Sequence, residues 1–301
     1  MKKLTLALDW TPNINHIGFF VAKQKGFYKD ANLDIEIIEP SSDNYQTTPA
    51  KKVELGMADL ALCPTESIIS YRTKSNPFPL IAVAAVLQND LSAIAVKRDS
   101  QVNSPRELDG KVYSSYKARY EDGIVREMIK NDGGKGDLKV IYPDKLGIWN
   151  TLLDGKADAT WVFLNWEGVE AENSEHELDY FKLDDYGIPY SYSPVIAANE
   201  TLIEGNLQDY KAFLDATKKG FLRCKEKPLE AIDILRDELF GDDKNLDLKS
   251  ALEITSEHFG DEASWGRIKK ENLERFLIWI KDKDLESIQV NTNDIFTEIC
   301  F

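Results

Sequence analysis

Cysteine, histidine and long apolar runs are scarce in this sequence, and each scarcity excludes a class of protein. The three cysteines, Cys63, Cys224 and Cys300, are an odd number at wide spacing. That pattern fits neither a disulfide framework nor a zinc site, so we expect free thiols in a reducing compartment. The three histidines lie far apart in the sequence and predict no metal pair. No run approaches the roughly 20 apolar residues that span a bilayer, so no transmembrane segment is expected.

Positive charge is also scarce relative to negative charge. The 301 residues carry 37 Lys and Arg against 52 Asp and Glu, which gives a net charge of −15. This field repels a phosphate backbone, so nucleic acid is not an expected partner. The hydrophobic fraction of 43% and the charged fraction of 30% are typical of an ordinary soluble protein. Its length suffices for one large domain or two ordinary ones.

The N-terminus lacks the full pattern of a secretory leader. Met1-Lys2-Lys3 begins as a leader does, but Asp9 interrupts the apolar run and no small-residue cleavage site follows. We therefore expect the chain as given to be cytoplasmic. A periplasmic or membrane-anchored extracellular location is expected instead if a leader was removed.

Apolar periodicity predicts strands that alternate with helices over the first two thirds of the chain. Beyond Asn199 the pattern changes to that of helices, with at most one further strand at 287–290. This order predicts an α/β fold with two sets of βα units and a helical C-terminal tail. Strands are expected at residues 4–8, 33–39, 57–62, 80–87, 91–98, 111–115, 138–142, 157–163, 180–183 and 192–198.

Four polar corners directly follow predicted strands, at residues 9–13, 63–67, 116–120 and 163–167. Ligands of open α/β sheets bind beyond the carboxyl ends of the strands. The first corner and the helix start behind it present an indole, two amides, a carboxylate and an imidazole. We therefore predict that these corners line a small-molecule site.

Three tryptophans, Trp10, Trp161 and Trp166, each stand at the end of a predicted strand. A single tryptophan there is explained equally well by core packing. Three at equivalent corners favour a ligand site, with Phe163 and Tyr190 assigned to the same walls. Aromatic faces stack on flat heterocycles, which contributes about 1–3 kcal/mol per base in nucleotide binders. A flat ligand is therefore expected.

Carboxylates at the corners are candidates for reading the edge of such a ligand. Glu66 is the leading one, because an ionised carboxylate accepts a hydrogen bond from an exocyclic amine. The alternative is that Glu66 only stabilises the start of a helix through the helix dipole. Asp9 and Glu167 are further candidates of the same kind.

Other corner residues have both a structural and a binding interpretation. Asn13 caps the following helix or reads a ligand edge, and His16 is a bonded structural side chain or a ligand contact. Cys63 is either an inert buried thiol or part of the site wall. Tyr116, Lys117, Arg119 and Tyr120 form a polar surface turn, or receive a phosphate or carboxylate with help from helix amides.

These residues together resemble the SsuA/THI5-like (NMT1/THI5) substrate-binding protein family, in particular its thiamine-pyrimidine branch. The resemblance covers the chain to about Ala198. The segment Ala22-Lys-Gln-Lys-Gly-Phe-Tyr28 marks the wider superfamily, and the tryptophan corners indicate pyrimidine binders. The other matching segments are Leu8-Asp-Trp-Thr-Pro-Asn13 with His16, Gly56-Met-Ala-Asp59, Pro64-Thr-Glu-Ser67, and Trp161-Val-Phe163 with Trp166-Glu-Gly168.

The resemblance implies a type II periplasmic-binding-protein fold, in which two α/β lobes are joined by two crossing strands and hold a ligand in the cleft between them. The crossings are expected near 91–96 and 194–198. Residues 1–92 and 196–301 then form the first, discontinuous lobe, and residues 93–195 form the second. Related bacterial proteins deliver a formylaminopyrimidine to a transporter, whereas related fungal proteins synthesise hydroxymethylpyrimidine phosphate from their own histidine and bound pyridoxal phosphate.

The chain departs from the fungal synthases at the residues that carry their chemistry. Their pyridoxal-binding lysine corresponds to about Cys63 and their donor histidine to about Ser67. Their cysteine-rich segment corresponds to Tyr190-Ser-Tyr-Ser-Pro194, which holds no cysteine. Their phosphate loop corresponds to residues 116–120. Because a thiol cannot form the Schiff base that an amine forms, the resemblance favours binding over synthesis, with Cys63 and Ser67 as ligand contacts.

The sequence thus predicts a binder of an aminopyrimidine thiamine precursor with no catalytic residue, no metal and no cofactor. One alternative is a divergent hydroxymethylpyrimidine phosphate synthase, which requires pyridoxal phosphate and iron. The other is a transport protein for sulfonates or another small anion. An ABC transporter permease is the expected protein partner if a leader was removed.

Overall fold

The computed structural model describes residues 1–144, 148–173 and 176–301. The chain forms two compact units. Unit 1 comprises Met1–Asp90, Ser191–Leu273 and Ile288–Phe301, and unit 2 comprises Leu91–Tyr190 and Glu274–Ser287. Within the described ranges, no helix has the length and apolar character needed to cross a membrane.

Unit 1 contains a five-stranded sheet with the order β2-β1-β3-β10-β4. Its strands are β1 (Lys2–Ala7), β2 (Leu33–Ile38), β3 (Leu60–Cys63), β4 (Leu80–Ala85) and β10 (Val195–Asn199). β1 pairs in parallel with β2 and β3, whereas β10 runs antiparallel to both β3 and β4. Because β1 and β3 are parallel neighbours, the corners that follow them lie at the same edge of the sheet.

The apolar run at 80–87 forms a strand that is buried throughout, as its composition predicts. All six residues of β4 are buried, although β4 is the last strand in the order. Isolated bridges from Phe296 to Ala82 and from Gly266 to Ala85 close its outer edge. The C-terminal part of the chain therefore protects an edge that would otherwise present unpaired backbone groups.

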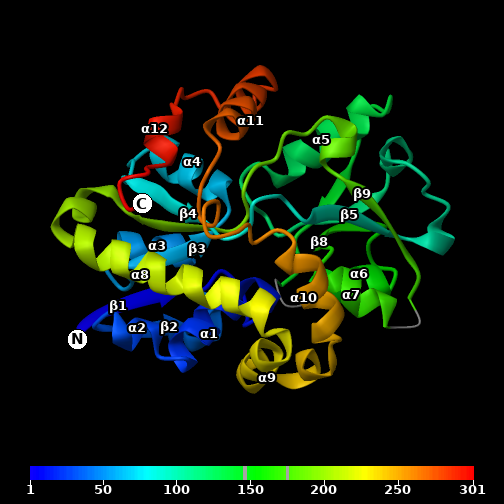
Figure 1. The fold of residues 1–301 in the computed structure, drawn as a ribbon. Helices are drawn as coiled ribbons and strands as arrows, with labels where there is room; N and C mark the ends of the chain where they lie inside the picture. Colours follow the sequence, from blue (N-terminus) through cyan, green and yellow to red (C-terminus); the bar gives the residue numbers. More distant parts are fainter. Residues whose placement is uncertain (145–147, 174–175) are drawn as a thin grey trace. The chain divides into compact units, whose positions relative to one another are not determined.

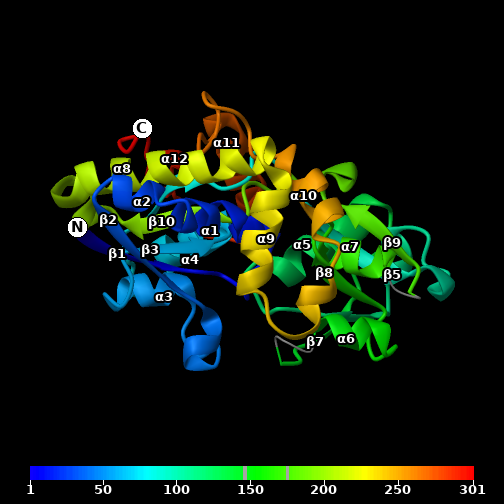
Figure 2. The ribbon, with the colours of Figure 1, turned by 60° about the horizontal axis from the view of Figure 1, so that its bottom comes forward.

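Helices cover both faces of this sheet, with α1 and α8 on one face and α3 and α4 on the other (Figure 2). α8 packs closely on α1, and the glycines of both helices permit the approach. The helices and short turns of unit 1 are η1 (Ile14–His16), α1 (Ile17–Gln24), α2 (Phe27–Asp30), η2 (Pro40–Asp43), α3 (Pro49–Glu54), α4 (Thr65–Thr73), α8 (Glu200–Glu226), α9 (Pro228–Glu238), η7 (Gly241–Asn245), α10 (Leu248–Ser256) and α12 (Thr292–Ile295).

Unit 2 repeats the same arrangement with the strand order β7-β6-β8-β5-β9. Here β5 is the antiparallel strand between β8 and β9, and β6 is parallel to β7 and β8. Figure 1 shows α5 on one side of this sheet and α6 and α7 on the other. Its strands and α-helices are β5 (Ser92–Lys97), β6 (Val112–Ser114), α5 (Glu121–Asn131), β7 (Lys139–Ile141), α6 (Ile148–Leu153), β8 (Ala159–Phe163), α7 (Glu167–Glu172), β9 (Leu178–Lys182) and, from Glu274 on, α11 (Lys270–Asp282).

A Gly-x-Ala-Asp turn occurs once in each unit and makes the same contacts both times. In unit 1, Asp59 accepts the amide of Thr5 at 2.8 Å through its carboxylate and donates its own amide to the carbonyl of Thr5. In unit 2, Asp158 makes the same two contacts with Val112. The preceding glycine is left-handed in both turns. The aspartate of each turn therefore hydrogen-bonds the start of one strand to its parallel neighbour, β3 to β1 in unit 1 and β8 to β6 in unit 2. These contacts lie at the edge of each sheet opposite the polar corners.

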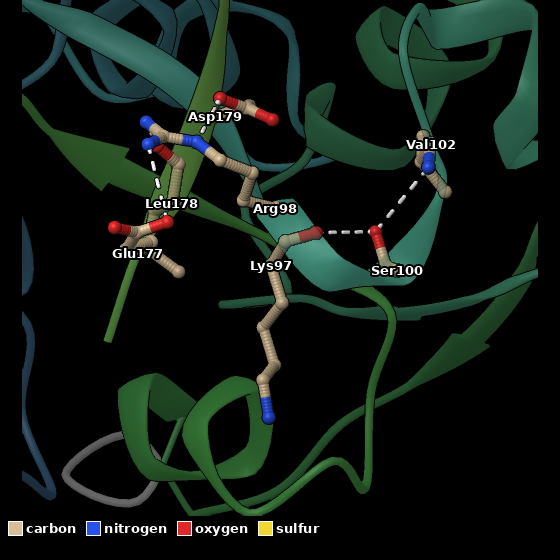
Figure 3. Close-up of polar contacts among 7 residues, drawn as sticks. All are labelled: Lys97, Arg98, Ser100, Val102, Glu177, Leu178 and Asp179. Carbon is tan, nitrogen blue, oxygen red and sulfur yellow. Dashed lines mark hydrogen bonds and ion pairs between the residues drawn. The ribbon is translucent and has the colours of Figure 1, made fainter. Parts of the chain in front are cut away.

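Polar contacts at the far end of β5 form a second cluster at that opposite edge of unit 2 (Figure 3). Arg98 pairs with Asp179 at 3.1 Å and with Glu177 at 3.3 Å. Ser100 donates to the carbonyl of Lys97. β5 runs antiparallel to β8, so this cluster lies beside the start of β8 and not beside its corner. Because Arg98 is more than half exposed, these ion pairs contribute little to stability.

The C-terminal tail is helical, as predicted, but the further strand expected at 287–290 does not form. The segment Glu274–Ser287 belongs to unit 2. Its Phe276 ring packs on Tyr190 at 5.5 Å, and a Cβ at Gly123 would lie 2.4 Å from the side chain of Leu285. The exact lobe bounds 1–92, 93–195 and 196–301 stay a prediction.

Candidate functional site

The corner after β1 is built around a short capped turn. Asn13 accepts the amide of Asn15 at 2.9 Å through its side chain and donates its side-chain amide to the carbonyl of Thr11. It is 7% exposed. The capping interpretation of Asn13 is therefore realised in the structure, while its contact with a ligand stays a prediction.

His16 holds the Asp9 side chain at this corner. The imidazole Nε2 lies 2.8 Å from Asp9 Oδ1, and the backbone amide of Asn13 donates a hydrogen bond to Nδ1 at 3.3 Å. The His16 side chain is fully buried, whereas that of Asp9 is 28% exposed. Within the described residues, His16 is the only hydrogen-bond partner of the Asp9 carboxylate. The corner thus presents a carboxylate that is fixed on one oxygen and accessible on its exposed side.

The corner after β3 lies beside that of β1 because the two strands pair directly. Burial, and then the nearby charges of Asp9 and Glu66, raise the pKa of the Cys63 thiol well above its usual range. Cys63 is therefore protonated at neutral pH and a poor nucleophile. Glu66 is 5% exposed and begins α4 together with Thr65, whose side chain and amide both donate to the carbonyl of Tyr192. Ser67 is half-buried in the same turn.

Two aromatic rings stand together at the same end of the unit 1 sheet. Trp10 meets Tyr45 edge to face, with ring centroids 5.8 Å apart, and both side chains are half-buried. Burial, followed by the charges of Glu39 and Asp243, raises the pKa of Tyr45. The sequence reasoning missed Tyr45, because a lone tyrosine in a polar loop carries no signal of its own.

In unit 2, Glu121 shapes the corner after β6. Its carboxylate accepts the Tyr113 hydroxyl at 2.7 Å and the backbone amides of Tyr116 and Ala118 at 3.0 and 3.2 Å. Burial raises the pKa of Glu121 in spite of these bonds. Lys117 takes a left-handed conformation and is exposed. Two backbone amides of this corner, those of Tyr116 and Ala118, are thus already bound to a carboxylate of the chain, while the binding of an anion with help from the amides of α5 stays a prediction.

Arg119 and Tyr120 of this corner bind a residue far away in the sequence. Glu286 Oε2 lies 2.7 Å from both the Arg119 guanidinium and the Tyr120 hydroxyl. The Glu286 side chain is 3% exposed, so the positive charge of Arg119 compensates a buried carboxylate. Sequence reasoning did not identify Glu286, since nothing in the sequence links positions more than 160 residues apart.

The corner after β8 is more buried than the corner of unit 1. Trp161 and Trp166 are 7% and 6% exposed, and Trp161 packs on Tyr190 with centroids 5.3 Å apart. Glu167 accepts the amide of Phe163 at 2.9 Å and so closes the turn into α7. Packing within the protein therefore buries most of the surface of both indole rings. Contacts of these residues with a ligand stay predictions.

The structure divides the predicted site residues between the two units. Unit 1 brings together Asp9, Trp10, Asn13, His16, Cys63, Glu66 and Ser67, and unit 2 brings together Tyr116, Lys117, Arg119, Tyr120, Trp161, Phe163, Trp166, Glu167 and Tyr190. Among the residues that the structure describes, no group of three or more His, Cys, Asp or Glu side chains is arranged to hold a metal ion.

Residues 13–231 match the protein family described as NMT1/THI5 like. The chain belongs to the NMT1/THI5-like family. The matched span includes three of the four corners and all of both sheets except β1. The family that the sequence resembles is thereby confirmed.

Relatives of this chain are named for two different functions, ligand binding and synthesis. The chain is 25% identical to the formylaminopyrimidine-binding protein of Halalkalibacterium halodurans, over 99% of this chain and 91% of that protein. It is 27% identical to the 4-amino-5-hydroxymethyl-2-methylpyrimidine phosphate synthase of Candida albicans, over 76% of this chain and 69% of that protein. The chain is therefore similar, at nearly equal sequence identity, to one protein named for binding and one named for synthesis.

Solved structures share the fold. The alkanesulfonate-binding protein SsuA of Xanthomonas axonopodis pv. citri, bound to MOPS, superposes with a TM-score of 0.73 at 12% identity, over 99% of this chain and 98% of that one. At this identity the likeness concerns the fold alone. The predicted periplasmic-binding-protein fold class is confirmed.

Proposed function

We propose that this protein binds an aminopyrimidine of the thiamine-precursor type, and that Asp9 accepts a hydrogen bond from the exocyclic amine of the ligand. The observation that carries the proposal is the hydrogen bonding and exposure of the Asp9 carboxylate. One oxygen of its carboxylate is held by a buried histidine, while the side chain keeps 28% exposure. A carboxylate fixed in this way is a preorganised acceptor for an amine.

Aromatic surface beside Asp9 suits a flat ligand. Trp10 is half-buried next to Asp9 in the sequence, and Tyr45 supports its ring from the side. Stacking of a base on an aromatic ring contributes about 1–3 kcal/mol in nucleic-acid binders. The indole would supply affinity for the ring, and Asp9 would supply the preference for its amino group.

The charge of the corner favours an amine over an anion. Asp9 and Glu66 both lie close enough to act on the pKa of Cys63. A sulfonate or nitrate at this corner would approach two carboxyl groups, which costs energy in a partly buried site. The relative named for formylaminopyrimidine binding supports the same ligand class for this chain.

A divergent pyrimidine phosphate synthase is the second candidate, because the family includes relatives named for that reaction. Two observations weigh against it here. The position that corresponds to the pyridoxal-binding lysine is Cys63, a buried thiol with a raised pKa. The histidine of the corner, His16, is fully buried with both nitrogens engaged. These residues do not fit pyridoxal phosphate.

A receptor for a transport system would have an ABC transporter permease as its partner, and this assignment forms part of the proposal. The compartment in which the chain acts stays a prediction, as does the contribution of the unit 2 corner residues to the ligand.

Isothermal titration of the protein tests the proposal. The ligands are 4-amino-5-hydroxymethyl-2-methylpyrimidine and its N-formylaminomethyl analogue, with thiamine, MOPS and nitrate as comparisons. We expect binding of an aminopyrimidine and no binding of either anion. Trp10→Ala should weaken binding by roughly 5- to 150-fold, which corresponds to the loss of about 1–3 kcal/mol of stacking.

Trp279→Ala is the matched control, because Trp279 lies on α11 in unit 2 and stacks on Phe276. It should leave the affinity unchanged. Absence of aminopyrimidine binding, together with binding of MOPS or nitrate, would replace the proposal with anion transport. A mass change of the protein after incubation with pyridoxal phosphate and iron under oxygen would instead favour the synthase.

A further inference from the structure

The imidazole of His16 is the only histidine ring of the three that is fully buried, and it is bound on both sides. His258 is half-buried and His176 is exposed. The His16 ring lies between a backbone amide at Nδ1 and the Asp9 carboxylate at Nε2. These two contacts determine both the position of the ring and the nitrogen that carries its proton.

The backbone contact determines where the ring carries its proton. The Asn13 amide can only donate, so Nδ1, at 3.3 Å, must offer its lone pair. A neutral imidazole with an unprotonated Nδ1 carries its hydrogen on Nε2. Nε2 therefore donates to Asp9 Oδ1, 2.8 Å away.

The local fold prevents the ring from reversing. His16 ends η1, and its own amide donates to the carbonyl of Asn13 at 3.0 Å, while the Asn13 side chain caps the same turn. α10 packs against η1. A flip of the ring would place the ring carbons Cδ2 and Cε1 where Nδ1 and Nε2 now lie, so the buried backbone amide of Asn13 and the Asp9 carboxylate would both lose their hydrogen-bond partner.

We infer that His16 is a positioning residue that selects the ligand through Asp9. By occupying Oδ1 with an N–H, it turns Oδ2 toward a second donor and makes the corner specific for a ring that presents an amine. A pyrimidine with an oxo group in place of the amine offers Asp9 an acceptor and is rejected. This inference rests on the proposed function, since it concerns how the same site recognises its ligand.

The first test concerns the tautomer and needs no ligand. Nitrogen-15 NMR of uniformly labelled protein at pH 7 resolves three histidine rings, and His16→Gln identifies the signal of His16. We expect a protonated Nε2 and an unprotonated Nδ1 in the folded wild-type protein. A protonated Nδ1 would overturn the inference, because that nitrogen could no longer accept the backbone amide.

The second test measures ligand preference in two variants. Gln keeps a side-chain N–H that can reach Asp9, whereas Leu removes it. Residues that orient a binding side chain from behind typically contribute 10- to 100-fold in metal sites. We therefore expect His16→Leu to lose about tenfold or more of the affinity for the 4-amino ligand and much of its preference over the 4-oxo analogue, and His16→Gln to restore most of both.

Controls separate this inference from the function on which it rests. His258→Gln and His176→Gln should leave affinity and preference unchanged. If wild-type protein binds no aminopyrimidine, the proposed function fails, and the ligand selection assigned to His16 fails with it. If wild type binds and a folded His16→Leu keeps the wild-type preference, the inference alone fails. If His16→Leu does not fold, the His16→Gln variant decides. Loss of the preference for the amine in His16→Gln overturns the inference. Retention of that preference, together with the expected tautomer in the wild-type protein, supports it.

Discussion

Gly220 on α8 allows two helices of unit 1 to approach more closely than side chains permit. A Cβ built at Gly220 would lie 2.1 Å from the carbonyl oxygen of Gly18 and 2.9 Å from the Cβ of Ala22, both on α1. Ordinary contacts between carbon atoms lie near 3.5–4.0 Å. The obstacle is backbone, which no rotamer change can remove. Gly220→Ala must therefore push the two helices apart.

The magnitude follows from two opposing effects. Overpacking typically costs about 1–3 kcal/mol, and a clash with backbone belongs at the upper end. Alanine in place of glycine in a helix contributes about 1 kcal/mol in the opposite direction. We expect Gly220→Ala to lower the free energy of unfolding by about 2 kcal/mol. For a domain of this size that corresponds to a fall in Tm of roughly 4–8 °C.

Gly205 provides a control in the first part of α8, before the kink at Asn206. Nothing lies within 4 Å of a Cβ built there, and the residue is exposed. Gly205→Ala should therefore raise the free energy of unfolding by up to about 1 kcal/mol. Urea denaturation followed by circular dichroism measures both variants. Equal changes in the two variants, or a Gly220→Ala protein as stable as wild type, would refute the close packing of α1 and α8.

Three further predictions concern thiols, acid stability and the repeated turn. All three cysteines are buried, and burial raises the pKa of every thiol, so a thiol reagent at pH 8 should react slowly with native protein and rapidly with all three in urea. Arg223 and Lys25 lower the pKa of Glu230 from 4.5 to about 2. Its stabilising effect is present above pH 4.5 and lost as the pH falls toward 2, so Glu230→Gln should show a smaller loss of Tm over that interval than wild type. Asp158→Ala removes the acceptor of the Val112 amide and should lower the free energy of unfolding by about 1–3 kcal/mol in urea denaturation; an unchanged value would contradict the role given to the turn.

Periodicity was sufficient to predict the strands of both sheets. The run at 33–39 alternates with period two and forms β2 with alternating burial at its start. The run at 80–87 is apolar throughout and forms a strand buried on both faces. Local patterns of this kind specify elements because each depends on neighbouring residues only.

Contacts that depend on distant segments could not be predicted. The Glu286 carboxylate that binds Arg119 and Tyr120 lies on the return of the C-terminal tail to unit 2. Tyr45 meets Trp10 only because the loop after β2 folds back over the corner. Neither pairing leaves a spacing or a motif in the sequence, since the chain between the partners sets their distance.

Roles at the first corner required coordinates even though its residues were identified from the sequence. Asn13 and His16 were predicted to read the edge of a ligand, and that contact stays a prediction. In the structure Asn13 caps η1, and His16 faces inward to hold Asp9. The direction in which a side chain points depends on the tight turn at 14–16, which periodicity does not resolve.

The central claim is that Asp9 recognises the amine of an aminopyrimidine. Asp9→Asn places an amide donor where the carboxylate accepts and changes the volume of the side chain very little. Isothermal titration of this variant with the 4-amino ligand and its 4-oxo analogue tests the claim most directly. We predict a loss of affinity for the amine of about 10- to 150-fold, the equivalent of a charged hydrogen bond of about 1.5–3 kcal/mol, and a gain for the oxo analogue. A variant that keeps the wild-type order of affinities would contradict the account.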